Sequence, residues 1–178
     1  MEEKAKSPAL KAALLYGAII GFVSIAVAVV LDLLGLTMET WAGLLSILIT
    51  IGLVIYSLRA YKKEYLGGTA KYDQLMLMTL LMSLVAAVLT TTYSAINITL
   101  IDPDALEKMS NMVYEKMANN SRITEDMLDV MMERMEGRFT FGRVIIQGFF
   151  GGYVMTVIVG VIAGAFIKSK TENPAVNV

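Results

Sequence analysis

Four long apolar runs with very little charge constrain this chain more than any other feature of its sequence. They lie at about residues 10–36, 41–58, 75–100 and 144–167, and the charged residues gather between them. Because a helix rises about 1.5 Å per residue, roughly 20 apolar residues cross the hydrocarbon core of a bilayer. Runs of this length lack the alternation of a barrel strand. The pattern predicts an all-α fold: a membrane four-helix bundle with four transmembrane helices.

Composition favours a single integral membrane domain over residues 1–178. Hydrophobic residues make up 56% of the chain and charged residues 17%, whereas soluble domains carry about 25% charged residues. The uncharged stretch from Ala12 to Leu31 is longer than the roughly 7–15 apolar residues of a signal-peptide core. We therefore expect a retained membrane helix at this position.

Basic residues predict the orientation of the spans. The segment before the first run, the loop between the second and third, and the tail after the fourth together hold 9 of the 15 basic residues. The segment from Ile101 to Gly142 holds nine acids against five bases. Short basic loops remain in the cytoplasm. We expect both termini in the cytoplasm and the Ile101–Gly142 segment on the other side of the membrane.

Several function classes find no support in the composition. The net charge is −1, and no basic stripe interleaved with aromatic residues indicates nucleic acid. The chain has no cysteine and no histidine, which removes thiol catalysis, the usual zinc ligands and the most common general base. No phosphate loop or metal motif is present. We expect no enzymatic activity, no cofactor and no metal.

The acidic segment at about residues 102–137 predicts an amphipathic helical hairpin between spans three and four. Asp102 is placed to cap a first helix, with Pro103 at its first position. A second helix begins at the cap Thr124, and Gly137 is placed to end it.

Seven of the 13 methionines of the chain lie in this hairpin. One interpretation is an adaptable partner-binding surface or a thioether site for a soft metal. The other is that apolar stripes pack against each other or onto the bilayer, which is the usual role of methionines at helical spacing. The candidate partner surface comprises Met109, Met131, Met132 and Met135.

Polar residues inside the spans form a second candidate site. Asp32 is the ionisable residue that lies within a span rather than at its edge, and Asn97 and Gln147 lie at similar depth near the outer end. We predict a shared polar layer beneath the hairpin. A proton or ion role for Asp32 competes with an interfacial role, in which its carboxylate reaches water.

Small residues recur every four positions in the first and last spans. Such glycine ridges let helix backbones approach closely. We expect them to pack against neighbouring spans, including each other, and a homodimer seam is the alternative. The helix-packing glycines are Gly17, Gly21, Gly148, Gly152, Gly160 and Gly164.

Three further motifs stand out in the sequence: Gly67-Gly68 in a tyrosine- and lysine-rich loop, Ile101-Asp102-Pro103-Asp104 after span three, and Phe149-Phe150-Gly151-Gly152-Tyr153 in the last span. With these motifs the chain resembles the bacterial membrane family catalogued as domain of unknown function 4199. The resemblance covers about Leu10 to Lys168 and implies the fold and a location in the bacterial plasma membrane, with no assigned activity.

Two functions remain open at this point. A structural or accessory protein, which binds the lipid bilayer and a membrane protein partner or a second copy of itself, needs the fewest special residues. A small oligomeric transporter or channel would use the polar layer of Asp32, Asn97 and Gln147. The spans show neither charged pathways nor broken-helix signals.

Overall fold

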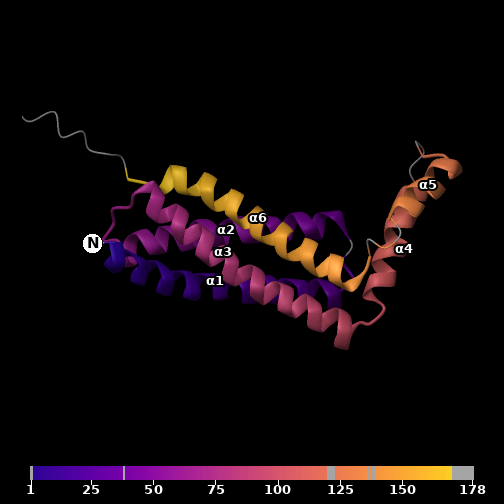
Figure 1. The fold of residues 1–178 in the computed structure, drawn as a ribbon, viewed down its shortest axis with the longest axis horizontal. Helices are drawn as coiled ribbons and strands as arrows, with labels where there is room; N and C mark the ends of the chain where they lie inside the picture. Colours follow the sequence, from indigo (N-terminus) through magenta and orange to yellow (C-terminus); the bar gives the residue numbers. More distant parts are fainter. Residues whose placement is uncertain (1, 38, 120–122, 136, 138, 170–178) are drawn as a thin grey trace, which may run out of the picture. The chain divides into compact units, whose positions relative to one another are not determined.

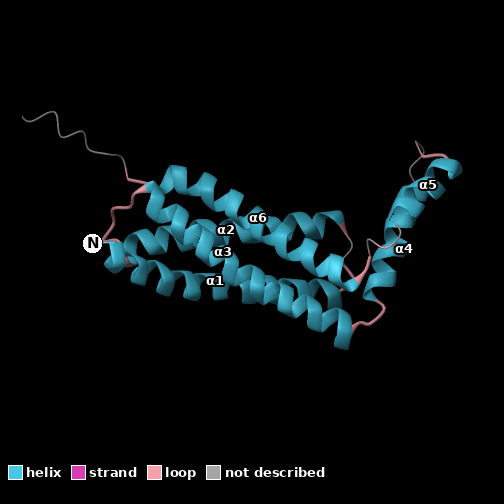
Figure 2. Cartoon of the chain, viewed as in Figure 1, coloured by secondary structure: helices cyan, strands magenta, loops and turns pink. Residues whose placement is uncertain are grey.

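The computed structural model describes residues 2–37, 39–119, 123–135, 137 and 139–169, and the regular elements in these ranges are all helices. The prediction of an all-α fold, with four long apolar helices and a helical segment between the third and fourth, is confirmed. In chain order (Figures 1 and 2), the elements are α1 (Glu2–Leu33), α2 (Thr40–Glu64), α3 (Tyr72–Ile96), the π-helical turn η1 (Asn97–Ile101), α4 (Ala105–Ala118), α5 (Glu125–Met135) and α6 (Phe141–Ile167).

Four segments of the described chain are long and apolar enough to cross a membrane, so the chain is a multi-pass membrane protein. Among these membrane-crossing segments, the largest difference from the expected bounds is in α2, which continues past Leu58 to Glu64. Lys62 and Lys63 lie in its last turn, where positive charge stabilises the negative end of the helix dipole. The four segments are Ala9–Leu33, Thr40–Glu64, Tyr72–Ile101 and Phe141–Ile167.

The chain forms two compact units. The first comprises Met1–Thr90 with Gly151–Val178, and the second comprises Thr91–Phe150. Both α3 and α6 begin in one unit and end in the other. The assignment of residues 1–178 to a single domain stays a prediction.

The core of the first unit is centred on α3. Its Leu75, Met78 and Met82 are fully buried and recur at intervals of three and four residues, so they share one helix face. Burial of such side chains provides the main stabilisation of a helix pair through close packing. The buried apolar residues that join them from α1, α2 and α6 are Ala9, Ala12, Ala13, Tyr16, Ile20, Val54, Leu58, Tyr61 and Ala163.

Glycines bring the backbone of α1 against α3. A Cβ atom at Gly17 would lie 2.6 Å from the carbonyl oxygen of Met82 and 2.7 Å from the Cβ of Val85. At Gly21 it would lie 2.9 Å from a methyl carbon of Leu89. A larger residue at either position meets atoms of α3, so the absence of a side chain is what permits this approach.

Two glycines of α6 also face α3. A Cβ at Gly160 would collide with the Thr79 side chain, with Oγ1 2.7 Å away, and one at Gly164 would touch Leu75 at 3.6 Å. Gly148 and Gly152 have no atom within 4 Å of the corresponding position. The nearest neighbours of the packed glycines in both ridges therefore belong to α3, and the ridge of α6 is packed over only part of its length.

Polar bonds join the helices at the end of the first unit where α1 begins (Figure 1). The Tyr16 hydroxyl donates to a Glu64 carboxylate oxygen at 2.8 Å, which links α1 to α2. The Lys62 ammonium donates to the carbonyl of Ile167 at 2.8 Å, which links α2 to the end of α6. The amide of Ser169 donates to the carbonyl of Ala70 at 2.9 Å.

The turn that follows α2 requires glycine. Gly67 and Gly68 have φ of +63° and +90°, a region that other residues rarely adopt. The amide of Gly68 donates to the carbonyl of Lys62 at 2.9 Å, which satisfies a carbonyl in the last turn of α2.

The helical hairpin of the second unit begins later than the sequence predicts. α4 starts at Ala105, so Pro103 is not its first residue, and Asp102 accepts from the Lys108 ammonium at 2.8 Å instead of capping with its side chain. The cause is the proline, because the residue before proline avoids the helical region, and Asp102 has φ −133° and ψ 83°. α3 ends at Ile96, and the π-helical turn η1 follows it, with the amide of Asp102 donating to the carbonyl of Asn97 at 2.8 Å.

The caps of α5 agree with the sequence. The hydroxyl oxygen of Thr124 accepts from the amide of Met127 at 3.4 Å, as an N-cap does. Gly137 follows the helix with φ +74°, the conformation of a glycine that ends a helix. α4 and α5 pack against each other, and Leu128 of α5 is 7% exposed.

Candidate functional site

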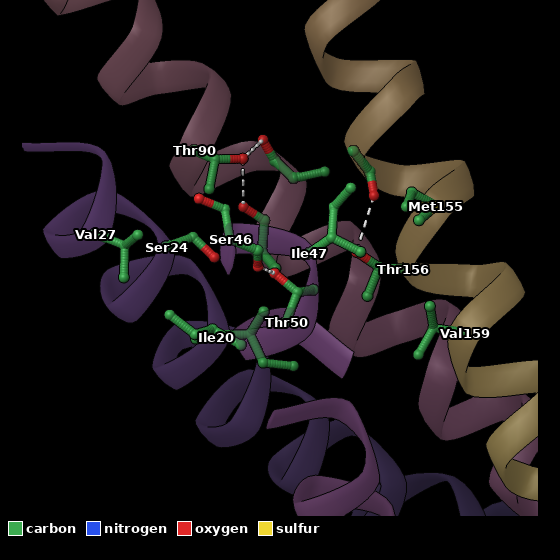
Figure 3. Close-up of a pocket in the computed structure, with 14 residues that line it drawn as sticks. Ile20, Ser24, Val27, Ser46, Ile47, Thr50, Thr90, Met155, Thr156 and Val159 are labelled. Carbon is green, nitrogen blue, oxygen red and sulfur yellow. Dashed lines mark hydrogen bonds between the residues drawn. The ribbon is translucent and has the colours of Figure 1, made fainter. Parts of the chain in front are cut away.

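A cavity of about 240 Å³ lies within the first unit, between α1, α2, α3 and α6. We call it the central cavity. Figure 3 shows Ile20, Ser24 and Val27 of α1 on one side, and Met155, Thr156 and Val159 of α6 on the other. Its complete lining is Ile20, Ser24, Val27, Ser46, Ile47, Ile49, Thr50, Ala86, Ala87, Thr90, Gly152, Met155, Thr156 and Val159.

Hydroxyl groups are the polar side chains of this lining. The hydroxyls of Thr50 and Thr156 donate to the carbonyls of Ser46 and Gly152, at 2.9 and 2.8 Å, and that of Thr90 donates to Ala86 at 3.0 Å (Figure 3). Each of these residues bonds one turn back along its own helix, as hydroxyls in apolar surroundings commonly do. With their protons engaged, these oxygens can act towards the cavity only as weak acceptors.

The chemistry of the central cavity is therefore mainly apolar. None of its described lining residues carries a charge, so a small ion finds no counter-charge there. Its volume lies below the roughly 300–1,000 Å³ of typical small-molecule sites. The cavity suits an apolar group such as part of a lipid chain better than a polar substrate.

Asp32 lies in the last turn of α1, and its carboxylate is exposed. The hydroxyl of Thr37, in the turn before α2, donates to it at 3.2 Å. Asn97 opens the turn η1, where its side-chain amide donates to the Tyr93 hydroxyl at 3.2 Å. Gln147 lies exposed on α6. Asp32 belongs to the first unit and the other two to the second, so their shared polar layer stays a prediction.

The methionine surface is described in part. Met109 of α4 and Met131 of α5 are half-buried, while the side chains of Met132 and Met135 lie outside the described part of the chain. Three other apolar residues of the hairpin, Tyr114, Met127 and Val130, are about half exposed. Within the described ranges, no group of three or more acidic residues is placed to hold a metal ion.

The lining of the central cavity was missed by sequence reasoning. Ser46 and Thr50 stand four residues apart and share a helix face, which was the available signal, but serine and threonine occur on many membrane helices. Two further buried hydroxyls, those of Thr79 and Ser83, have no hydrogen-bond partner among the described residues. Both lie on the face of α3 that packs in the core.

Comparison with known families matches most of the chain. The family model described as protein of unknown function (DUF4199) matches residues 15–169. The chain belongs to this family. No curated protein and no solved structure matches it. DUF4199 membership confirms the resemblance carried by the glycine loop, the Asp-Pro-Asp turn and the last span, and it assigns no activity to the residues of either unit.

Proposed function

We propose that this DUF4199 protein is a non-catalytic accessory protein of the membrane, which presents the α4–α5 hairpin to a membrane protein partner. The observation that carries the proposal is the exposed apolar surface of the hairpin. α4 and α5 already pack against each other, with Leu128 buried, yet Tyr114, Met127 and Val130 expose 45%, 52% and 49% of their surface. Aromatic and methionine side chains are enriched at protein interfaces.

The orientation that supports this role places both termini in the cytoplasm and the hairpin outside. Nine basic residues on the three segments of one side support it. The chain lacks native cysteine, which permits a direct test by single substitutions. Asn111→Cys in α4 should react with a membrane-impermeant maleimide in intact cells, and Lys71→Cys should react only after permeabilisation. The reverse pattern would contradict the orientation.

Photo-crosslinking tests the partner itself. A benzoyl-phenylalanine at Tyr114 or Met127, in the full chain expressed in the source cells, should give a discrete protein adduct. The matched control is the same group at Glu107, an exposed polar position of α4. Adducts to lipid alone, or equal adducts from all three positions, would overturn the proposal. Substitution of Tyr114, Met127 and Val130 by alanine should abolish co-purification of the partner without lowering the melting temperature.

A small oligomeric transporter or channel is the second candidate, and the central cavity between four spans is the observation that favours it. In this function Asp32, Asn97 and Gln147 supply the polar path. Asp32→Asn should then change a growth or flux phenotype at unchanged expression, with Asp73→Asn at the start of α3 as the control. A phenotype identical to the wild type removes Asp32 from such a path.

A further inference from the structure

A second pocket lies at the end of the first unit where α2 and α6 end. Its volume is about 310 Å³, and we call it the basic pocket. Three of its lining residues are cations of α2, and the others come from the turn after α2 and from the end of α6. The lining consists of Arg59, Lys62, Lys63, Gly68, Phe166 and Ile167.

The three cations are held close together without a neutralising acid. Arg59 and Lys63 are four residues apart on α2 and share a face, where like charges repel. Among the described residues, no carboxylate pairs with these cations or lines the pocket. The adjacent acid, Glu64, accepts instead from the Tyr16 hydroxyl of α1. An anion in the pocket would relieve this repulsion.

Lys62 is fixed by the fold. Its ammonium donates to the carbonyl of Ile167 at 2.8 Å, so the last turn of α6 holds it at the pocket. The other nearby cation, Lys168, lies 5.8 Å from the centre of the Tyr72 ring and is not part of the lining. The basic pocket therefore contains one lysine that a hydrogen bond holds in place, Lys62, and two solvent-accessible cations, Arg59 and Lys63.

The position of the pocket selects the kind of anion. α2 and α6 are candidate spans that end at Glu64 and Ile167, so their ends lie at the depth of lipid head groups. Phe166 lines the same pocket and is 86% exposed, which gives an acyl chain an apolar surface beside the cations. A guanidinium binds phosphate oxygens in bidentate fashion.

We infer that the basic pocket, through Arg59, Lys62 and Lys63, binds the phosphate of an anionic membrane lipid. Basic pockets between membrane helices are suited to anionic head groups, and each cation contributes about fivefold in affinity. This site is separate from the hairpin surface, and its occupancy does not depend on the accessory function. Free inorganic phosphate could bind the same cations, so the experiment tests both a phospholipid and inorganic phosphate as the source of the phosphate.

The test uses the full chain in detergent micelles, with bound lipid counted by native mass spectrometry and stability followed by melting temperature. Dioleoyl phosphatidylglycerol should bind more tightly than dioleoyl phosphatidylcholine. Arg59→Gln/Lys63→Gln should weaken phosphatidylglycerol binding by about thirtyfold, as two cations are lost. The control pair Lys11→Gln/Lys71→Gln removes two exposed charges that do not line the pocket and should leave binding within about threefold.

A charge-preserving pair guards against a folding artefact. Arg59→Lys/Lys63→Arg should retain phosphatidylglycerol binding within about threefold of the wild type. Unchanged binding in Arg59→Gln/Lys63→Gln, equal losses in the control pair, or equal binding of the two lipids would each overturn the inference. A rise in melting temperature with inorganic phosphate, without any effect of phosphatidylglycerol, would assign the pocket to free phosphate and overturn the lipid source.

Discussion

The two halves of the first unit are built from the same four helices but pack differently. In the half where α1 begins, Leu58, Met78 and Met82 are fully buried, and Gly17 and Gly160 bring α1 and α6 close to α3. In the other half the four helices surround the central cavity, and no atom lies within 4 Å of the position that a Cβ would take at Gly152.

The difference shows that glycines on one helix can have opposite effects on packing. Gly160 and Gly152 lie eight residues apart on α6, yet only Gly160 faces a side chain of α3 closely, that of Thr79. In the close-packed half the glycine permits contact, and any added atom strains the interface. In the half with the cavity the glycine leaves space unfilled, and an added methyl group has room.

Gly17→Ala should cause the largest loss of stability, because its methyl group meets the Met82 carbonyl and the Val85 Cβ. Overpacking of this kind costs about 1–3 kcal/mol, and the contact with backbone places the cost at the upper end. Unfolding in mixed micelles by a denaturing detergent measures it. Gly43→Ala on α2, where no atom lies within 4 Å, is the control. Equal stability of the two variants would contradict the close contact of α1 with α3.

Tyr16→Phe should have an intermediate effect, because it removes the hydroxyl that donates to Glu64 at 2.8 Å. Hydrogen bonds to charged groups contribute about 1.5–3 kcal/mol, and the partial exposure of the Glu64 carboxylate lowers the expected loss to about 1 kcal/mol. The same unfolding measurement applies. Tyr56→Phe is the matched control, since Tyr56 contacts the Tyr16 ring edge-to-face and is 60% exposed. Tyr56→Phe keeps the ring and removes a hydroxyl that has no role in the Tyr16–Glu64 bond, so an equal loss in this variant would contradict a specific contribution of that hydrogen bond.

Gly152→Ala should have the smallest effect and the opposite sign. Its methyl group meets no atom within 4 Å, and alanine in a helix is favoured over glycine by up to about 1 kcal/mol. We expect unchanged or slightly higher stability, whereas Gly160→Ala on the same helix should be destabilising. If both substitutions destabilise equally, the two halves of the first unit do not differ in packing.

Much of the fold was predictable because the lipid environment and local capping residues determine it. An apolar run such as Ala12–Leu31 must be a helix in lipid, and the caps at Thr124 and Gly137 act within one turn of the chain. The predicted helix ends were wrong at two places where a local effect of the sequence was overlooked. α2 extends to Glu64 because basic residues suit a helix end, and α4 starts at Ala105 because Pro103 constrains Asp102.

The candidate sites were predictable only in residue type. Seven methionines and the basic loop are visible in the sequence, but which methionines are exposed depends on how α4 meets α5. The basic pocket joins Arg59 to Phe166, which are far apart in the chain. The periodicity of the sequence does not predict this contact. It forms because α6 ends beside α2, where the carbonyl of Ile167 accepts the hydrogen bond from Lys62.

The sequence by itself determined four membrane spans, a helical segment between the last two and membership of DUF4199. These properties depend on hydrophobicity, local capping and motifs, each of which acts over neighbouring residues. Only the tertiary structure decided that the packed glycines of α1 and α6 both face α3, and that a cavity and a basic pocket remain between the helices. The physical reason is that lipid solvates an apolar helix face as well as a neighbouring helix does. The hydropathy of the sequence therefore does not indicate which neighbour a given helix face contacts.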